Sequence, residues 1–363
     1  MKASNKKFKL EQPIWTIVLP IIAWIVFFIG EHTSWPLFFI VSSIALIGGV
    51  LSAVHHAEVI AHRIGEPFGA LVLALAVTVI EVSLIVSIML ASGTAASSLA
   101  RDTVFAAVMI ILNGIVGLSI FVGGLKFKEQ TFTLQAVSSV LTILVAISIL
   151  TLILPNFTVA IRGPFYSKTQ LIFVAIITLL LYGSFLFVQN IRHKDHFVPT
   201  EDEQEVHQAK PGKNAAIFSG IYLMVCLGAV VFLAELLAPG LEHWIISVGA
   251  PISLSGIIIA CVVLLPEGLS AIKAAKSNQL QKSFNLSLGS ALASIGLTIP
   301  TVSILSIFMG LPLTLGINSE STILFLLSLF IIVLSLSTGK TTILQGIVLM
   351  VLFFVYLFIT IFP

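Results

Sequence analysis

The sequence predicts an all-α polytopic membrane protein of about eleven transmembrane helices, arranged as one N-terminal helix and two inverted five-helix repeats. Three observations predict this fold. The chain of 363 residues is 58% apolar and only 9% charged, with a mean hydropathy of +1.13, which is more apolar than a soluble core requires. Its apolar residues form spans that reach the roughly 20 residues needed to cross a bilayer. Its basic residues collect in alternate loops between those spans.

Eleven apolar spans follow one another along the chain, separated by short polar or turn-forming segments. We expect each span to form one transmembrane helix. The spans cover residues 14–30, 37–55, 66–91, 102–124, 131–153, 169–189, 214–237, 244–273, 283–309, 320–337 and 341–362.

The distribution of Lys and Arg predicts the orientation of the chain in the membrane. With a cytoplasmic N-terminus, 15 of the 18 basic residues lie in cytoplasmic segments, and only Arg101, Arg162 and Lys168 lie outside. Cytoplasmic loops carry an excess of Lys and Arg. We therefore expect a plasma (inner) membrane protein with its N-terminus inside and its C-terminus outside.

A charged insert divides the spans after the first one into two sets of five. The predicted segments are an N-terminus with the first helix (1–36), a first repeat (37–189), a charged cytoplasmic linker (190–213) and a second repeat (214–363). Because five is odd, the two sets enter the membrane in opposite directions. Inverted repeats of this kind place a shared site near the middle of the bilayer.

Each set carries one glutamate inside its second span, Glu81 in the first and Glu267 in the second. A charge at membrane depth costs about 2.5–3.5 kcal/mol on insertion scales, so such residues are functional candidates by default. We interpret the pair as a site that binds a cation and exchanges protons. For Glu81 the alternative is a buried carboxyl group that only hydrogen-bonds a neighbouring helix.

Oxygen-bearing side chains accompany both glutamates at same-face helical spacing. Thr78 precedes Glu81 by three positions, and Ser270 follows Glu267 by three. Both hydroxyl groups are candidate cation ligands, because hard cations such as Ca²⁺ take six to eight oxygen ligands.

A proline directly before Glu267 predicts a helix break. Pro266 has no N–H, so the carbonyl of Val262 loses its helical donor. Freed carbonyls at membrane depth are tolerated where they face protein or a wet cavity, and they would add oxygen ligands beside the carboxylate. The alternative is an ordinary proline kink with no binding role.

The next span of each set supplies possible supporting groups. Asn113 lies deep in the first of these spans and is a candidate ligand, whereas Asp102 and Asn285 lie near helix starts and are expected to act mainly as N-caps. Ser294 and Thr298 are further polar candidates in the second set.

Two stretches resemble a known family. LPEGLSAIKAAKSNQLQKSFNLSLGSALASIGLTIPTV is similar to the second repeat motif of the cation/proton exchangers, the Ca²⁺:H⁺ antiporters of the calcium/cation antiporter superfamily. GEPFGALVLALAVTVIEVSLI, followed by RDTVFAAVMIILNGIVGLSIFVGGLKFKEQ, resembles the first repeat motif in the bacterial sodium/calcium–proton antiporter branch. The resemblance implies eleven helices in two inverted repeats that exchange a cytoplasmic cation for external protons. It also implies that Glu81 and Glu267 are the central acidic residues and that Asn113 matches the first-repeat asparagine.

The motifs depart from the better-known calcium exchangers at both acidic positions. Those exchangers carry Gly-Asn-Ala-x-Glu, whereas the acids here lie in TVIEVS and LLPEGL. Ala293 and Ser294 also stand where those exchangers often have glutamine. A site with these changes is expected to be less selective for calcium, which leaves Na⁺ or K⁺ open.

The expected function is secondary active antiport of Ca²⁺, with Na⁺ or K⁺ as further cargoes, against H⁺. Burial disfavours the charged form of a carboxyl group, so cation and protons compete for the same oxygens. The alternatives are a mainly Na⁺(K⁺)/H⁺ antiporter of the same fold and a passive cation channel. An enzyme is not expected, because HExxH and GxSxG motifs are absent from the sequence. The expected partners are inorganic cations and the bilayer, with no cofactor and no nucleic acid, and the oligomeric state is left open.

Two other polar stretches have alternative interpretations. If residues 55–62 are helical, His55, Glu58 and His62 share a face and could bind a transition metal or sense pH, with His56 beside them. We favour an interfacial connector instead. The acidic run at 201–205 could bind cations, but a solvated linker is the favoured interpretation.

Overall fold

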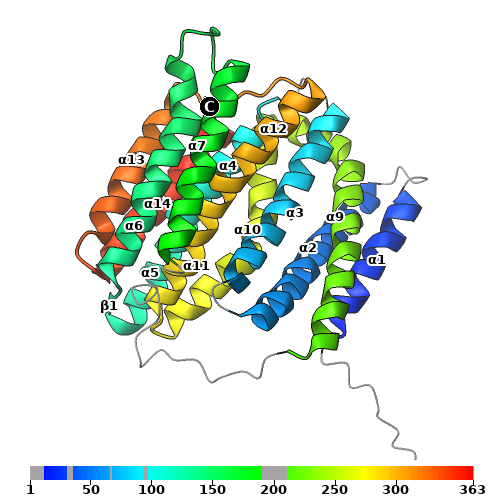
Figure 1. Cartoon of the computed structure of the whole chain (residues 1–363), viewed down its shortest axis with the longest axis horizontal. Coiled ribbons are helices and arrows are strands. Elements are labelled where there is room, and N and C mark those ends of the chain that lie inside the picture. Colours follow the sequence, from blue (N-terminus) through cyan, green and yellow to red (C-terminus); the bar gives the residue numbers. More distant parts are fainter. Residues whose placement is uncertain (1–11, 31–35, 66–67, 93–96, 190–210, 363) are drawn as a thin grey trace, which may run out of the picture. The chain divides into compact units, whose positions relative to one another are not determined.

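The computed structural model describes residues 12–30, 36–65, 68–92, 97–189 and 211–362 (Figure 1). The chain forms two compact units. Unit 1 comprises Met1–Leu73 and Ala209–Leu236, and unit 2 comprises Ala74–Gln208 and Leu237–Pro363. The boundary between the units falls within the helices α3 and α9.

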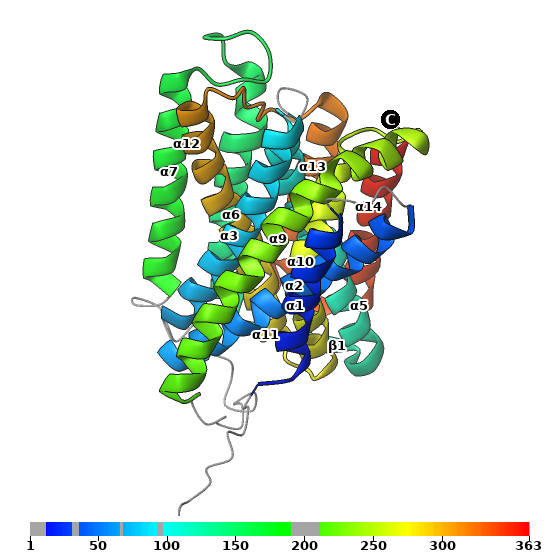
Figure 2. The same ribbon diagram turned by 90° about the vertical axis from the view of Figure 1, so that its right-hand side faces the viewer.

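Unit 1 is built from α1 (Trp15–Gly30), α2 (Pro36–Ile64) and the first part of α9 (Lys213–Ser247). Its core is formed by small and branched side chains, which allow close packing of helices: Ala23, Val26, Ala45, Ala229 and Leu233. Figure 2 shows α1 next to α2, and the Trp24 side chain of α1 donates to the Val225 carbonyl of α9 at 3.1 Å.

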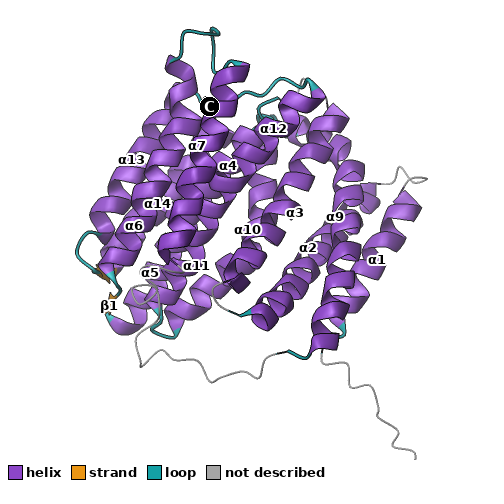
Figure 3. Cartoon of the chain, in the orientation of Figure 1, coloured by secondary structure: helices purple, strands orange, loops and turns teal. Residues whose placement is uncertain are grey.

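Unit 2 contains the last part of α9, most of α3 and all the remaining elements. In the first half of the chain these are α3 (Phe68–Ser92), α4 (Leu99–Met109), η2 (Ile110–Ile115), α5 (Val116–Phe127), β1 (Glu129–Thr131), α6 (Leu134–Ser148), η3 (Ile149–Ile153), η4 (Leu154–Phe157) and α7 (Lys168–Phe187). In the second half they are α10 (Leu254–Lys276), α11 (Leu280–Ala293), η7 (Ser294–Thr298), α12 (Ile299–Met309), α13 (Ser319–Leu336), β2 (Lys340–Thr342) and α14 (Ile343–Ile361). Figure 3 shows that helices make up almost all of the described chain.

The predicted all-α membrane fold is confirmed. The described residues contain 10 helices that are long and apolar enough to cross a membrane, and the apolar helix Trp15–Gly30 is shorter, at 16 residues. Two of the spans, Leu99–Phe127 and Leu280–Met309, each consist of an α-helix, a π-helical segment and a second α-helix.

Two predicted boundaries are wrong. The span expected at 37–55 continues to Ile64, so the polar residues that follow position 55 are helical. The span expected to begin at 244 begins only at Leu254, because α9 continues through Pro239 to Ser247. A proline removes one backbone hydrogen bond, and membrane helices tolerate that loss where neighbouring groups satisfy the freed carbonyl.

The elements of unit 2 meet closely at two places that hold the site in position. A Cβ added to Gly256 of α10 would lie 2.7 Å from the carbonyl carbon of Asp102, so α4 and α10 approach backbone to backbone there. At one end of unit 2, β1 pairs antiparallel with β2, with Gln130 opposite Thr341. The Gln130 side chain donates to the carbonyl oxygen of Ala275, at 3.1 Å, which fixes the C-terminal end of α10.

Candidate cation and proton site

Glu81 is held by two hydroxyl groups from the second half of the chain. Its side chain lies on α3 and is only 3% exposed. Ser294 donates to both carboxylate oxygens, at 2.8 Å and 2.9 Å, and Thr298 donates to Oε2 at 3.0 Å. These two residues are the first and last of η7, so the π-helical segment is the part of its span that contacts the carboxylate.

This arrangement suits both a charged carboxylate and a bound cation. Hydrogen bonds from neutral donors stabilise a carboxylate in a buried setting. The hydroxyl oxygens of Ser294 and Thr298 also carry lone pairs, and oxygen is the ligand that Na⁺, K⁺ and Ca²⁺ share. π-helical segments inside α-helices occur frequently at functional sites.

Glu267 occupies a comparable position on α10, with 8% of its surface exposed. Its helix packs against η2, and a Cβ on the adjacent Gly268 would lie 3.2 Å from Cδ1 of Ile115. η2 also contains Asn113, which lies 14 residues after Leu99, just as Ser294 lies 14 residues after Leu280. Glu81 therefore contacts the π-helical segment η7, and the helix that carries Glu267 packs against the π-helical segment η2.

Asn113 is completely buried and bonded through its nitrogen. Nδ2 donates to Oγ of Ser328 on α13 at 3.0 Å and lies 3.6 Å from the sulfur of Met109. The carboxamide oxygen, Oδ1, accepts no hydrogen bond from any described residue. Sequence reasoning missed Ser328, because one serine in an apolar helix carries no pattern that distinguishes it.

The other two predicted ligands, Thr78 and Ser270, lie on the same helices as Glu81 and Glu267. The Thr78 hydroxyl is buried but donates to the carbonyl of Ala74 at 2.8 Å, one turn back on its own helix. Ser270 lies on an exposed part of α10, although Glu267 three residues earlier is buried. Neither hydroxyl has a hydrogen bond to a glutamate among the described residues.

The helix break predicted at Pro266 is not found. α10 runs without interruption from Leu254 to Lys276. The carbonyl of Val262 still lacks the N–H that Pro266 cannot supply, but the hydrogen bonds on either side keep the helix continuous. In the spans that directly follow α3 and α10, the regular α-helix is interrupted at η2 and η7.

Asp102 and Asn285 are not N-caps, because both helices begin earlier than expected. Ser98 occupies the N-cap position of α4, and Asp102 pairs with Arg101, whose Nη2 lies 2.7 Å from Oδ1. Asn285 lies inside α11 and accepts a hydrogen bond from Gln281 at 2.7 Å. Asp102 is therefore paired with Arg101, and Asn285 is bonded by Gln281 one turn earlier on the same helix.

The histidine segment is helical and forms the last part of α2. In unit 1, His56 is fully buried between Ser219 Oγ and the Thr16 carbonyl, each 3.2 Å from a ring nitrogen. His55 contacts Gln12 at 2.9 Å. The described residues contain no group of three or more His, Cys, Asp or Glu that could hold a metal ion. The acidic run at 201–205 lies outside the described residues.

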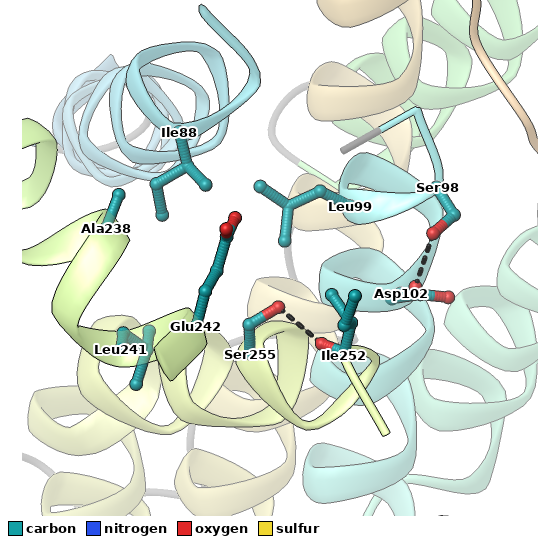
Figure 4. A pocket seen from close by; sticks show the side chains of 9 residues that line it. All are labelled: Ile88, Ser98, Leu99, Asp102, Ala238, Leu241, Glu242, Ile252 and Ser255. Atoms are coloured by element: carbon teal, nitrogen blue, oxygen red, sulfur yellow. Dashed lines mark hydrogen bonds between the residues drawn. The ribbon is translucent and has the colours of Figure 1, made fainter. Parts of the chain in front are cut away.

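A pocket opens in unit 2 along the helix that carries Glu81 (Figure 4). Ile88 lines it and follows Glu81 by seven residues, which is two helical turns on the same face. Figure 4 shows the Glu242 side chain pointing between Ile88 and Leu99, and Asp102 bonded to Ser98 at 2.9 Å. The other lining residues are Ala238, Leu241, Ile252 and Ser255.

The family model described as "Sodium/calcium exchanger protein" matches residues 34–190 and 218–362. This chain belongs to that family. Within it, the exchanger is 41% identical over 367 residues to y4hA of Sinorhizobium fredii, with 100% of both chains covered. It is 35% identical to the sodium-potassium/proton antiporter ChaA of Escherichia coli, over 98% of this chain and 99% of ChaA.

More distant relatives include a calcium exchanger. The exchanger is 28% identical to the Ca²⁺/H⁺ antiporter ChaA of Bacillus subtilis over 53% of this chain and 55% of that one. Its fold is similar to the solved structure of native YfkE, with a TM-score of 0.75 and 20% identity over 96% of this chain and all of YfkE.

These findings confirm the predicted family and its general activity. The exchanger is a multi-pass membrane cation/proton antiporter of the calcium/cation antiporter superfamily and not an enzyme. Its substrates are inorganic cations.

Proposed function

We propose that this antiporter binds its cation at Glu81 and Glu267, and that cation and protons displace one another there. The observation that carries the proposal is the contact between the Glu81 carboxylate and the hydroxyls of Ser294 and Thr298. A buried acid from one half of the chain is bonded to the other half, so a change in its protonation or its ligand acts on both.

Competition converts binding into exchange. A buried carboxylate needs a positive partner, which either a proton or a cation supplies. If the site opens alternately to the two sides, the ion in excess on each side replaces the other. With the N-terminus cytoplasmic in the inner membrane, the antiporter exports a cytoplasmic cation against external protons.

The cargo that the site favours is Na⁺ or K⁺. The Glu81 carboxylate contacts two neutral hydroxyls, so a monovalent cation balances its single charge when Glu267 keeps its proton. ChaA of Escherichia coli, which aligns over nearly its whole length, is named as a sodium-potassium/proton antiporter. Both observations support a monovalent cargo.

Ca²⁺ is the second candidate. Glu81 and Glu267 together supply two negative charges, which would neutralise one divalent cation, and carboxylate oxygens are its preferred ligands. The Bacillus subtilis relative named as a Ca²⁺/H⁺ antiporter supports this cargo, although the match covers only 53% of this chain.

Proton flux in proteoliposomes distinguishes the candidates. Vesicles with an acidic interior receive Na⁺, K⁺ or Ca²⁺ outside while a dye reports internal pH. We expect Na⁺ or K⁺ to dissipate the gradient at lower concentrations than Ca²⁺. Dissipation by Ca²⁺ alone would select the second candidate. A gradient insensitive to all three cations would contradict the proposed exchange.

A further inference from the structure

Ser328 lies on α13, outside both stretches that resemble the family's repeat motifs, yet it contacts the candidate site. Its side chain is fully buried, and Oγ accepts a hydrogen bond of 3.0 Å from Nδ2 of Asn113. The bond joins residues 215 positions apart. Burying two polar side chains between transmembrane helices costs desolvation free energy. What this hydrogen bond provides in return is a fixed orientation of the Asn113 side chain.

The surroundings of Asn113 decide which way its carboxamide points. A serine hydroxyl could face either end of the amide, because it can both donate and accept. Met109 removes the ambiguity, since its thioether sulfur can only accept, and the amide end that faces Ser328 lies 3.6 Å from that sulfur. The NH₂ group therefore faces Ser328 and Met109, and Oδ1 points elsewhere.

The free end of the amide is an oxygen buried without a donor. Asn113 is 0% exposed, and Oδ1 accepts no hydrogen bond from the described residues. A buried acceptor without a partner costs free energy, and a cation or a proton donor would satisfy it. Asn113 also stands at the same place in its span as Ser294, the residue that contacts Glu81.

We propose that Ser328 is a positioning residue that holds the Asn113 amide with Oδ1 toward the transported cation. The proposal rests on the proposed function, because it assigns Oδ1 to the same cation site. Turned by half a rotation, the amide would present two N–H donors, which repel a cation. Ser328 thus acts through Asn113 and touches no ion itself.

Cation-dependent proton flux and cation-induced thermal stabilisation test the proposal together. The variants are Ser328→Ala, Ser328→Thr and, as a matched control one heptad further along α13, Ser335→Ala. Losing one orienting hydrogen bond is expected to raise the half-saturating cation concentration of Ser328→Ala by about 3- to 10-fold, as typical for such bonds, while the maximal rate is kept. Ser328→Thr, which retains the hydroxyl, and Ser335→Ala should match the wild type.

An Asn113→Ala background separates positioning from general damage. There the Ser328→Ala change should have no further effect on half-saturation, because the oriented group is already gone. Two results would overturn the proposal if the wild type still exchanges. One is that the effects of Ser328→Ala and Asn113→Ala on half-saturation are fully additive, and the other is that Ser328→Ala leaves half-saturation unchanged. Absence of cation-dependent flux in the wild type would instead overturn the proposed function and this inference with it.

Discussion

The Glu81 half and the Glu267 half of the site share a scaffold and differ in chemistry. In both, the glutamate lies on a continuous helix next to a π-helical segment from the other half of the chain: Glu81 on α3 contacts η7, and α10, which carries Glu267, packs against η2. Glu81 is contacted directly by the hydroxyls of Ser294 and Thr298. The corresponding segment near Glu267 offers the amide of Asn113, which a third helix holds.

The hydroxyl of Thr298 has no counterpart in the first half of the chain. Gly117 lies 18 residues after Leu99, where Thr298 lies 18 residues after Leu280. A Cβ on Gly117 would lie 2.9 Å from Cβ of Leu349, so this position serves the packing of α5 against α14. The two halves therefore have similar backbone arrangements, but different side chains stand at the equivalent positions.

Removing either carboxylate should have the largest effect. Glu81→Gln and Glu267→Gln keep the volume and remove the titratable group, so both are expected to reduce cation/proton exchange to background. Proton flux in proteoliposomes measures this. If only one of the two variants lost exchange, the two glutamates would not be equivalent, and one of them alone would perform the exchange.

Removing the hydroxyls should weaken cation binding strongly on the Glu81 side. Hydrogen bonds to charged groups contribute about 1.5–3 kcal/mol each, so Ser294→Ala alone should raise half-saturation by roughly 10- to 100-fold, and adding Thr298→Val should raise it further. Flux against cation concentration measures the change. The single substitution Thr301→Val, at an exposed position whose hydroxyl bonds only to the Leu297 carbonyl, is the control and should leave half-saturation unchanged.

Lowering the pH should weaken apparent cation binding, because protons occupy the same carboxylates. One competing proton raises half-saturation by up to about tenfold for each unit of pH below the point where the site begins to protonate. The sign follows from competition: more protons leave fewer ionised carboxylates for the cation. Half-saturation that stays constant with pH would show that the two ions bind at separate places.

Filling the close contact of α4 and α10 should reduce stability rather than selectivity. Gly256→Ala places a carbon 2.7 Å from backbone atoms of Asp102, and such overpacking typically costs about 1–3 kcal/mol. Thermal unfolding in detergent measures the loss. Gly289→Ala, at a helical position where nothing lies within 4 Å, should keep or slightly increase the unfolding temperature.

The smallest effect is expected at Asp102. Its ion pair with Arg101 is partly exposed, with side chains 12% and 19% accessible, and pairs near a surface contribute about 1 kcal/mol or less. Asp102→Asn should therefore change half-saturation by no more than about fivefold, the factor that corresponds to 1 kcal/mol. A loss as large as that of Glu81→Gln would make Asp102 a third member of the site.

The spans and the two glutamates could be predicted because their signals are local. Long apolar runs identify helices, and an acid inside such a run is conspicuous, as at Glu81 and Glu267. Ser294 was a candidate because it lies in a repeat-like motif, but its partner could not be derived from spacing.

The remaining details depend on contacts between distant segments. The bond from Asn113 to Ser328 joins α4–η2 to α13, and nothing in the apolar run of α13 marks Ser328. The continuity of α10 through Pro266 depends on the packing around it rather than on the residue. The π-helical segments likewise follow from how the spans pack, since neither IILNGI nor SIGLT has a distinctive pattern.

Proton release on cation binding tests the central claim most directly. Detergent-solubilised protein in weak buffer at a pH where the site is partly protonated would receive Na⁺, K⁺ or Ca²⁺ while a pH dye records the protons released. We predict release in the wild type, reduced release in Glu81→Gln and in Glu267→Gln, and none in the double variant. Equal release from the wild type and the double variant would contradict competition at these two glutamates.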